Sequence, residues 1–428
     1  MAQPLTLAAL APPALVEGAA RCSSAEVAVL ADERARAYER GAVVTFDGPP
    51  SLETVVTYHA LWRAGAVAAP LHHRLTERER AHLVQRYAAH REPTDSDVAV
   101  LLATSGSSGV PKIVRHSSAA LAGKGAIMAA AHGLTPDDVI LMPAPLAHVS
   151  GLLNGILVPG AAGMTTVLMQ RWAPAEALDL IEAERVTFMI GPPTFFVQLA
   201  AEPGFSPERV ASLRLLSCGG AGVTAEWAKQ AADTFGAVVK RTYGSTEAPT
   251  ITTSYVGDPL AKGWETDGRV TGDVEIRLDG EELLCRGAEL FVSYADGSGR
   301  DADGWYRTGD RARIEDGWLV CLGRIGDTII RGGENVDPVE VEIVCARIPG
   351  VRQAVVVGIP DEVMGERIGL AVVADGSVDL EVVKAHCAEE GLARFKVPEK
   401  VVTVAEMPTL TVGKPDKAAL KVLLARRG

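Results

Sequence analysis

Apolar runs and amphipathic stretches alternate along much of the chain. The continuous apolar run VAVLLAT at 98–104 predicts a strand buried on both faces, as in a parallel sheet. Before it, Thr76 and Glu79 have capping-box spacing at the start of an amphipathic stretch, which predicts a helix. Further helix–strand pairs occur over 51–71 and 176–236. This alternation predicts an α/β fold with a largely parallel sheet.

The pattern changes after about residue 270, where short β runs separated by Gly turns predict hairpins or a small barrel-like region. Asp337 as N-cap and Pro338 in the first turn then predict a new helix. We therefore expect a large N-terminal domain over 1–323, built of layered α/β subdomains plus the small β-barrel-like region. A small C-terminal α+β domain over 327–428 follows, with a hinge at 324–326.

The N-terminal stretch MAQPLTLAALAPPALVEGAARC is apolar, but it lacks the basic region that opens a signal peptide. Pro12, Pro13 and Glu17 interrupt it, and we expect a first helix followed by a turn. Since no charge-free run of about 18 apolar residues occurs, no membrane span is expected.

Composition narrows the function classes. The 428 residues carry a formal net charge of −12, which argues against nucleic acid or an anionic membrane as partner. The six cysteines form no C-x-x-C pair, so they are expected to be reduced thiols of a cytoplasmic protein rather than metal ligands or disulfides. The composition remains compatible with a protein that binds a small anionic ligand through a few well-placed cations and backbone amides.

The stretch TSGSSGVPK follows the predicted buried strand directly. Its first six residues and its last are candidates for anion binding: Thr104, Ser105, Gly106, Ser107, Ser108, Gly109 and Lys112. Glycine lets backbone amides approach an oxyanion closely, and a lysine adds a point charge. The run lacks the Gly-Lys-Ser/Thr of a Walker A loop, and taken alone it is also compatible with a simple polar turn, since most Gly- and Ser-rich turns connect elements without binding a ligand.

TSGSSGVPK resembles the phosphate-loop signature of the adenylate-forming superfamily, which includes acyl-CoA synthetases, adenylation domains of peptide synthetases and luciferases. The other signatures of that family appear in its order. They are ALWRAGAVAAPL (60–71), PLAHVSGL (145–152), YGSTEAP (243–249), YRTGD (306–310), LGRIGDTIIRGGENVDPVEVE (322–342) and LTVGKPDKAAL (410–420). The resemblance covers residues 60 to 420 and implies a mobile C-terminal domain, with ATP, Mg²⁺ and coenzyme A as cofactors.

The resemblance also implies roles for single residues. The nucleotide-binding set would be Thr104, Ser105, Gly106, Ser107, Ser108, Gly109, Lys112, Gly219, Gly220, Ala221, Tyr243, Gly244, Asp310 and Arg324. Within it, Tyr243 would stack on adenine, and Asp310, helped by Arg324, would accept the ribose hydroxyls. Lys414, Thr246 and Glu247 would be the catalytic residues, with Glu247 also the ligand to Mg²⁺. Lys417 and Lys421, by contrast, are expected to be solvated helix residues.

The acyl pocket would be lined by His148, Val149, Gly151 and Phe195, with the neighbouring Phe196. These positions offer no acid for a substrate amine, which favours an apolar or aromatic monocarboxylic acid of modest size.

Gly332 and Gly333 match a Gly-Gly that shapes the thiol tunnel in acyl-CoA-forming relatives. Gly326 stands at the hinge position, where relatives usually carry Asp or Lys. The stretch before the phosphate loop is shorter than in relatives, which leaves a homodimer open.

The expected reaction is ATP-dependent formation of an acyl-adenylate, followed by thioester formation with coenzyme A. Two alternatives stay open: an adenylation enzyme that loads a carrier protein, and a nucleotide-binding relative without catalytic activity.

Overall fold

The computed structural model describes residues 5–90, 92, 96–104, 111–219, 223–410 and 414–426. The chain divides into two compact units. The first comprises Met1–Arg277, Leu284–Arg307 and Ile314–Val320; the second comprises Leu278–Leu283, Thr308–Arg313 and Cys321–Gly428. The boundary that the sequence predicts at 324–326 stays a prediction. None of the described helices combines the length and apolar character needed to cross a membrane.

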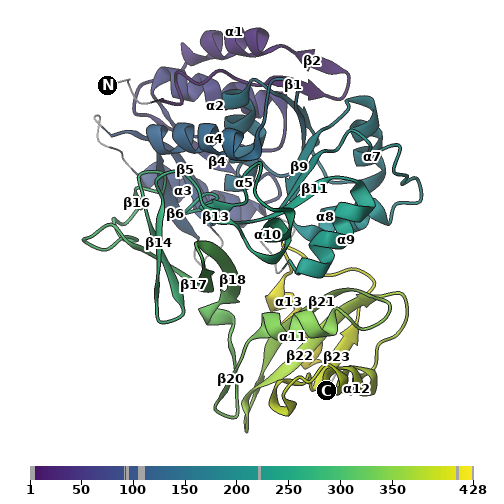
Figure 1. Ribbon diagram of the computed structural model, residues 1–428. Coiled ribbons are helices and arrows are strands. Elements are labelled where there is room, and N and C mark those ends of the chain that lie inside the picture. Colours follow the sequence, from purple (N-terminus) through teal and green to yellow (C-terminus); the bar gives the residue numbers. More distant parts are fainter. Residues whose placement is uncertain are drawn as a thin grey trace. The chain divides into compact units, whose positions relative to one another are not determined.

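The larger sheet of the first unit has the order β13-β12-β11-β10-β9-β7-β8-β1-β2 (Figure 1). Its strands are β1 (Ala14–Glu17), β2 (Ala20–Cys22), β7 (Val139–Met142), β8 (Thr165–Leu168), β9 (Phe188–Gly191), β10 (Leu215–Gly219), β11 (Val238–Tyr243), β12 (Thr252–Thr253) and β13 (Arg269–Val270). Neighbours from β11 through to β1 pair in parallel. The pairs at the two ends of the sheet are antiparallel: β1 with β2, β11 with β12, and β12 with β13.

A second sheet of this unit has the order β16-β6-β5-β4-β3. Its strands are β3 (Val43–Asp47), β4 (Val67–Leu71), β5 (Val98–Thr104), β6 (Lys112–Ser117) and β16 (Ser293–Tyr294). The predicted strand at 98–104 is confirmed, and its first five residues are buried. It pairs in parallel with β4 but antiparallel with β6, so this sheet is mixed.

Several helices of the first unit begin at a residue whose side chain caps the helix. The helices of this unit are α1 (Ser24–Ala35), α2 (Leu52–Ala64), α3 (Glu77–Ala89), α4 (Ser118–His132), α5 (Val149–Leu152), the π-helix η1 (Leu153–Leu157), α6 (Val158–Ala162), α7 (Pro174–Ala183), α8 (Pro193–Ala200), α9 (Ala225–Phe235) and α10 (Leu260–Glu265). The predicted capping box of Thr76 and Glu79 is present at the start of α3. Thr224 caps α9, which ends at Gly236 with φ +61°.

Helices cover both faces of the larger sheet. Along β7, Ile140 and Met142 pack into one core cluster and Leu141 into the other, as alternating strand positions require. Residues of α1, α2 and α4 complete the first cluster, and residues of α7, α8 and α9 complete the second (Figure 1).

The prediction of a helix at the N-terminus is wrong. Ala14–Glu17 and Ala20–Cys22 form the strands β1 and β2 instead. β1 extends the parallel sheet by pairing with β8, from Ala14 opposite Thr165 onward. This long-range pairing prevails over the helical preference of the Ala- and Leu-rich sequence.

A four-stranded sheet of order β14-β15-β17-β18 contributes residues to both units. Its strands are β14 (Glu275–Asp279), β15 (Glu282–Arg286), β17 (Tyr306–Glu315) and β18 (Trp318–Arg324). These are the short β runs that the sequence predicts after residue 270.

The remainder of the second unit is a sheet covered by helices. Its elements are the 3-10 helix η2 (Ile325–Asp327), β19 (Ile329–Arg331), β20 (Glu334–Val336), α11 (Pro338–Cys345), β21 (Val351–Asp361), β22 (Gly365–Ala374), α12 (Leu380–Glu389), the 3-10 helix η3 (Arg394–Lys396), β23 (Lys400–Thr403) and α13 (Lys417–Ala425). Val356 of β21 packs with residues of α11 and α12, whereas its neighbours Val355 and Val357 pack with α13. The predicted caps Asp337 and Pro338 open α11.

Lys417 is not the solvated helix residue that the sequence suggests. Its Nζ donates to Asp327 Oδ2 at 2.7 Å, so the start of α13 is tied to η2. The nearby Glu342 of α11 accepts a hydrogen bond from Val356 N at 2.8 Å. Burial raises the pKa of Glu342 to about 7, with the Asp327 carboxylate adding to the shift and Lys417 opposing it.

Replacing Glu342 by Gln should therefore change how stability depends on pH. In the unfolded chain this carboxyl titrates near its ordinary value of 4.5, so the folded state binds more protons between about pH 4.5 and 7. The contribution of Glu342 is full below that window and is lost as the pH rises through about 7. Between pH 5 and pH 8, the free energy of unfolding should therefore fall by roughly 1–3 kcal/mol less in Glu342→Gln than in the parent, as measured by urea unfolding.

The matched control is Glu389→Gln, which removes an exposed carboxylate of α12. It should leave the pH dependence nearly as in the parent. Indistinguishable pH profiles for the two variants would contradict a buried, neutralised Glu342.

Candidate functional site

Four loops of the first unit emerge at one edge of the larger sheet, because β7, β9, β10 and β11 run parallel. The loop after β7 carries His148, and the segment after β9 carries Phe195. Gly219 ends β10, and Tyr243 ends β11. The chain runs from β7 to β8 on one side and then crosses to β9 on the other. Such a switch point at the carboxyl ends of strands is where open α/β sheets bind ligands.

Two predicted nucleotide-binding glycines lie where a side chain would clash. A Cβ on Gly219 would lie 2.8 Å from both Cγ2 and O of Thr242 on the adjacent strand, and a Cβ on Gly244 would lie 2.3 Å from Thr250 N. At these two points, at the ends of β10 and β11, the structure therefore has no room for a side chain. Gly220 and Ala221 lie outside the described residues.

The predicted phosphate loop connects two paired strands. Thr104 at the end of β5 is opposite Lys112 at the start of β6, so both ends of the loop are held together. The residues between them that were assigned to phosphate binding, Ser105, Gly106, Ser107, Ser108 and Gly109, lie outside the described residues. The exposed Lys112 borders a cavity of about 60 Å³.

Tyr294 joins the phosphate-loop lysine to the predicted metal ligand. Its hydroxyl donates a hydrogen bond to Glu247 Oε1 at 2.7 Å, and Lys112 Nζ lies 4.5 Å from the centre of its ring. Tyr294 reaches this place because β16 pairs with β6, opposite Val114. Sequence reasoning missed it, because no local pattern around Tyr294 marks a pairing across roughly 180 residues.

The segment Thr246–Glu247 is fixed to neighbouring elements by its backbone. His116 of β6 lies 2.8 Å from Thr246 O through Nε2, and Phe291 N donates to Glu247 O at 2.8 Å. Burial lowers the pKa of His116 to about 4, so the ring is neutral near pH 7 and Nε2 carries the proton that it donates. The backbones of Thr246 and Glu247, the two catalytic candidates of this unit, are thus held in place independently of their side chains.

The Glu247 carboxylate has one oxygen that could coordinate a metal ion. The residue is buried, Oε1 is occupied by Tyr294, and the described chain gives Oε2 no hydrogen-bond partner. Among the described residues no group of three or more His, Cys, Asp or Glu side chains is placed to hold a metal. One carboxylate is nevertheless what Mg²⁺ needs where phosphates and water complete its shell, so Glu247 fits that ion.

His148 has a local role whatever else it does. It is the N-cap of α5, where Nδ1 accepts a hydrogen bond from Ser150 N at 3.2 Å. A Cβ on Gly151 would lie 2.1 Å from Pro145 O, so this turn of helix depends on glycine. Val149 is buried. The π-helix η1 that follows is a geometry common at functional sites.

Phe195 and Phe196 point to different environments. Phe195 is partly exposed and stacks on Trp172, with ring centres 4.4 Å apart. Phe196 is 1% exposed and packs in the core beside Trp227 and Phe235, so it does not line a pocket. Trp172, which the sequence reasoning did not select, therefore stands with Phe195 in the candidate acyl region.

In the second unit, the predicted ribose ligands do lie together. Asp310 on β17 is buried and pairs with the exposed Arg324 on β18, with Nε 3.1 Å from Oδ1. Asp310 N also donates to Thr308 Oγ1 at 3.0 Å.

Gly332 and Gly333 form the two-residue turn between β19 and β20. Their φ angles of +58° and +86° are those of a type I′ hairpin, which glycine adopts without strain. A Cβ on Gly332 would lie 2.6 Å from Met364 Cε, whereas one on Gly333 would meet nothing within 4 Å. The hairpin is thus a sufficient structural reason for this Gly-Gly. Gly326 lies in η2, where a Cβ would also meet nothing within 4 Å.

Lys414 is exposed. Leu410 N donates to Lys414 O at 2.7 Å, and Thr409 forms a bridge with Pro415. The three residues between Leu410 and Lys414 lie outside the described residues.

Two family models match the chain. The model for AMP-binding enzymes matches residues 84–289, and the model for the C-terminal domain of AMP-binding enzymes matches residues 340–414. A feruloyl-CoA synthase of Amycolatopsis sp is 31% identical over 444 residues, which cover 91% of this chain and 90% of that relative. The chain belongs to the AMP-binding enzyme family. The superfamily resemblance read from the motifs is thereby confirmed.

Other relatives of this AMP-binding family member agree. A medium-chain fatty-acid–CoA ligase of Escherichia coli is 33% identical over 77% of this chain, but the chain spans only 62% of that ligase. Among solved structures, ATP-bound MatB from Rhodopseudomonas palustris is 25% identical with a TM-score of 0.86, covering 98% of this chain and 99% of that one. The predicted α/β class with a large N-terminal and a small C-terminal part is confirmed by this match.

Proposed function

We propose that this protein is an AMP-forming acid–thiol ligase, which activates a carboxylic acid with ATP and transfers the acyl group to coenzyme A. The observation that carries the proposal is the contact of Tyr294 with both Lys112 and Glu247. Through Tyr294, the Lys112 ammonium at the end of the candidate phosphate loop lies close to the Glu247 carboxylate, which suits Mg²⁺. ATP-bound MatB and the CoA ligases among the relatives support this assignment.

In the first half-reaction the substrate carboxylate attacks the α-phosphorus of ATP, an acyl-adenylate forms and pyrophosphate leaves. Thr104 and Lys112 would hold the leaving pyrophosphate, since hydroxyl and ammonium groups stabilise its growing charge. Glu247 would ligate Mg²⁺, which neutralises phosphate charge when bound. Tyr243 would stack on adenine, and Asp310 would accept the ribose hydroxyls.

The substrate class follows from the candidate acyl region. Val149, Phe195 and the stacked Trp172 are apolar, and His148 and Gly151 complete the region without an acid to pair a substrate amine. An apolar or aromatic monocarboxylate of modest size fits these residues. The named substrates of relatives, which include ferulate, medium-chain fatty acids and indoleacetate, belong to this class.

The decisive experiment is ATP–pyrophosphate exchange with a panel of aromatic and aliphatic monocarboxylates, followed by thioester assays with coenzyme A. Exchange with at least one acid, and transfer to coenzyme A, is the expected result. Exchange without transfer to coenzyme A would favour the carrier-protein alternative, and no exchange with any acid would favour a binding protein without catalytic activity. Cytoplasmic location and a homodimer remain predictions.

Glu247 and Tyr294 should act as one unit in adenylation. Glu247→Gln should keep the fold and lose most exchange activity, because an amide is a poor Mg²⁺ ligand. Tyr294→Phe keeps the ring beneath Lys112 but removes a hydrogen bond to a charged group, so it should lower exchange at limiting Mg²⁺ by about 10-fold or more. In the double variant the losses should not multiply. Fully multiplying losses, or full exchange activity of Glu247→Gln, would contradict the assignment.

Lys414 should matter for one half-reaction only. An ammonium aimed at the α-phosphate stabilises charge that develops in the transition state, so Lys414→Ala should slow adenylate formation by at least about 10²-fold. With preformed acyl-adenylate, the same variant should make thioester at nearly the parent rate. Lys421→Ala is the matched control, because Lys421 is exposed on α13, whereas Lys417 is paired with Asp327. Equal losses of Lys414→Ala in both half-reactions would contradict a role of Lys414 that is confined to adenylation.

The thiol-tunnel role of Gly333 needs a substitution that keeps the hairpin. Asn tolerates positive φ better than other side chains, and at Gly333 it would meet open space. Gly333→Asn should impair thioester formation more than adenylation if the thiol passes there. Gly350→Asn is the control, since Gly350 has φ +82° and equally open surroundings in the same unit. The tunnel assignment fails if Gly333→Asn reduces both half-reactions equally or neither of them.

A further inference from the structure

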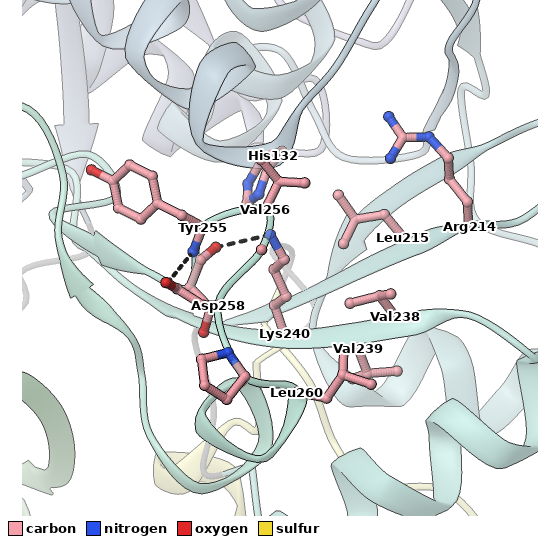
Figure 2. Close-up of a pocket in the computed structure, with 14 residues that line it drawn as sticks. His132, Arg214, Leu215, Val238, Val239, Lys240, Tyr255, Val256, Asp258 and Leu260 are labelled. Atoms are coloured by element: carbon pink, nitrogen blue, oxygen red, sulfur yellow. Dashed lines mark hydrogen bonds between the residues drawn. The ribbon is translucent and has the colours of Figure 1, made fainter.

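A pocket of about 110 Å³ lies at the edge of the larger sheet opposite to the proposed nucleotide site (Figure 2). It is formed where β10 and β11 begin, since Leu215 and Val238 are the first residues of these strands. Its lining residues are His132, Arg214, Leu215, Val238, Val239, Lys240, Ser254, Tyr255, Val256, Gly257, Asp258, Pro259, Leu260 and Gly263.

The loop that walls the pocket is well fixed. Val256 N donates to Ala131 O at 2.8 Å, which attaches the loop to α4. Tyr255 N donates to Asp258 Oδ2 at 2.7 Å, and Arg269 pairs with the same carboxylate at 3.1 Å. The pocket is therefore part of the fold rather than a gap beside a loose loop.

Lys240 places a cation inside this pocket. The residue is 5% exposed, and its Nζ donates to Ser254 O at 2.9 Å. An ammonium has three donors, so two remain for another acceptor. Burial lowers the pKa of Lys240 to about 8, which leaves it mostly charged at neutral pH. In Figure 2 its nitrogen points toward the ring of His132.

Two further buried polar groups of the pocket have no partner in the described chain. They are the ring nitrogens of His132, which is 1% exposed, and the Oγ of Ser254, which is 3% exposed. Burial lowers the pKa of His132 to about 3, so the ring is neutral and carries one donor. Native proteins leave few such groups unsatisfied, since each costs about 1–3 kcal/mol.

The charge of the pocket fits a monoanion. Arg214 is paired with Asp138 at 2.6 Å, and Asp258 is paired with Arg269. Lys240 forms no ion pair within the described chain, so one positive charge remains uncompensated. At the mouth, the exposed Val238, Val256 and Leu260 offer apolar surface.

We propose that this pocket binds a small monocarboxylate with a short apolar body, as a second site separate from the acyl pocket. Lys240, His132 and Ser254 would donate hydrogen bonds to the carboxylate, and Val238, Val256 and Leu260 would cover the body. An engineered cavity of about 150 Å³ holds benzene, so a pocket of this size suits about four to six heavy atoms. The proposal does not rest on the proposed function, because binding here needs neither ATP nor catalysis.

The test is calorimetric titration of the whole chain with butyrate, with butylammonium, 1-butanol and inorganic phosphate as comparison probes at fixed ionic strength. Butyrate should bind the parent at a site that Lys240→Met weakens by about 10²-fold and Ser254→Ala by about 10-fold. Lys229→Met, which changes an exposed lysine of α9, should bind butyrate like the parent. Butyrate in the acyl pocket would bind all variants alike, so only the difference between variants reports this site.

Ser254→Ala also guards against a folding artefact. Since its hydroxyl has no partner in the described chain, this variant should unfold at the parent temperature or slightly above it while its butyrate affinity falls. Equal butyrate binding by the parent, Lys240→Met and Ser254→Ala would overturn the proposal. So would phosphate or butylammonium binding at this site more tightly than butyrate.

Discussion

The common direction of four neighbouring strands is the constraint on which the candidate site depends. Because β7, β9, β10 and β11 are parallel, every loop that follows them opens at one edge of the sheet. The residues that the family resemblance selects in the first unit, from His148 to Glu247, are far apart in sequence but emerge there together. Gly219 and Gly244 then keep the backbone bare at the strand ends, where a Cβ would strike Thr242 or Thr250.

Signals confined to a few neighbouring residues were read correctly from the sequence. The capping box of Thr76 and Glu79, the N-cap Thr224 and the buried strand at 98–104 each depend on local hydrogen bonds or on a short apolar run. The N-terminal strands were missed for the opposite reason. Ala14 becomes part of a strand only because β8 is available to pair with it, and no local pattern encodes that partner.

The same limit explains what was missed in and near the site. Tyr294 contacts Glu247 through a strand pairing that joins distant segments, and Lys417 meets Asp327 across 90 residues of sequence. Motif matching found Asp310 and Arg324 as a pair, because both lie in signatures that the family shares. It gave Gly332 and Gly333 a role in the thiol tunnel, although the hairpin alone accounts for glycine at both positions. A motif therefore draws attention to a position, while the physical reason for the residue type found there comes from the structure.

The acidic balance of the chain gives its cations distinct uses. With a net charge of −12, most buried or partly buried basic side chains have a carboxylate nearby, as Lys124 has Glu289 and Arg241 has Asp267. Such pairs neutralise charge that would otherwise be costly to bury, and they leave no charge for a ligand. Lys112 and Lys240 differ, because neither forms an ion pair within the described chain: one lies over an aromatic ring and the other donates to a carbonyl. Lys112 lies beside the proposed phosphate loop, and Lys240 lies inside the second pocket. A cation that the fold leaves without a carboxylate partner is therefore the feature common to both proposed anion sites.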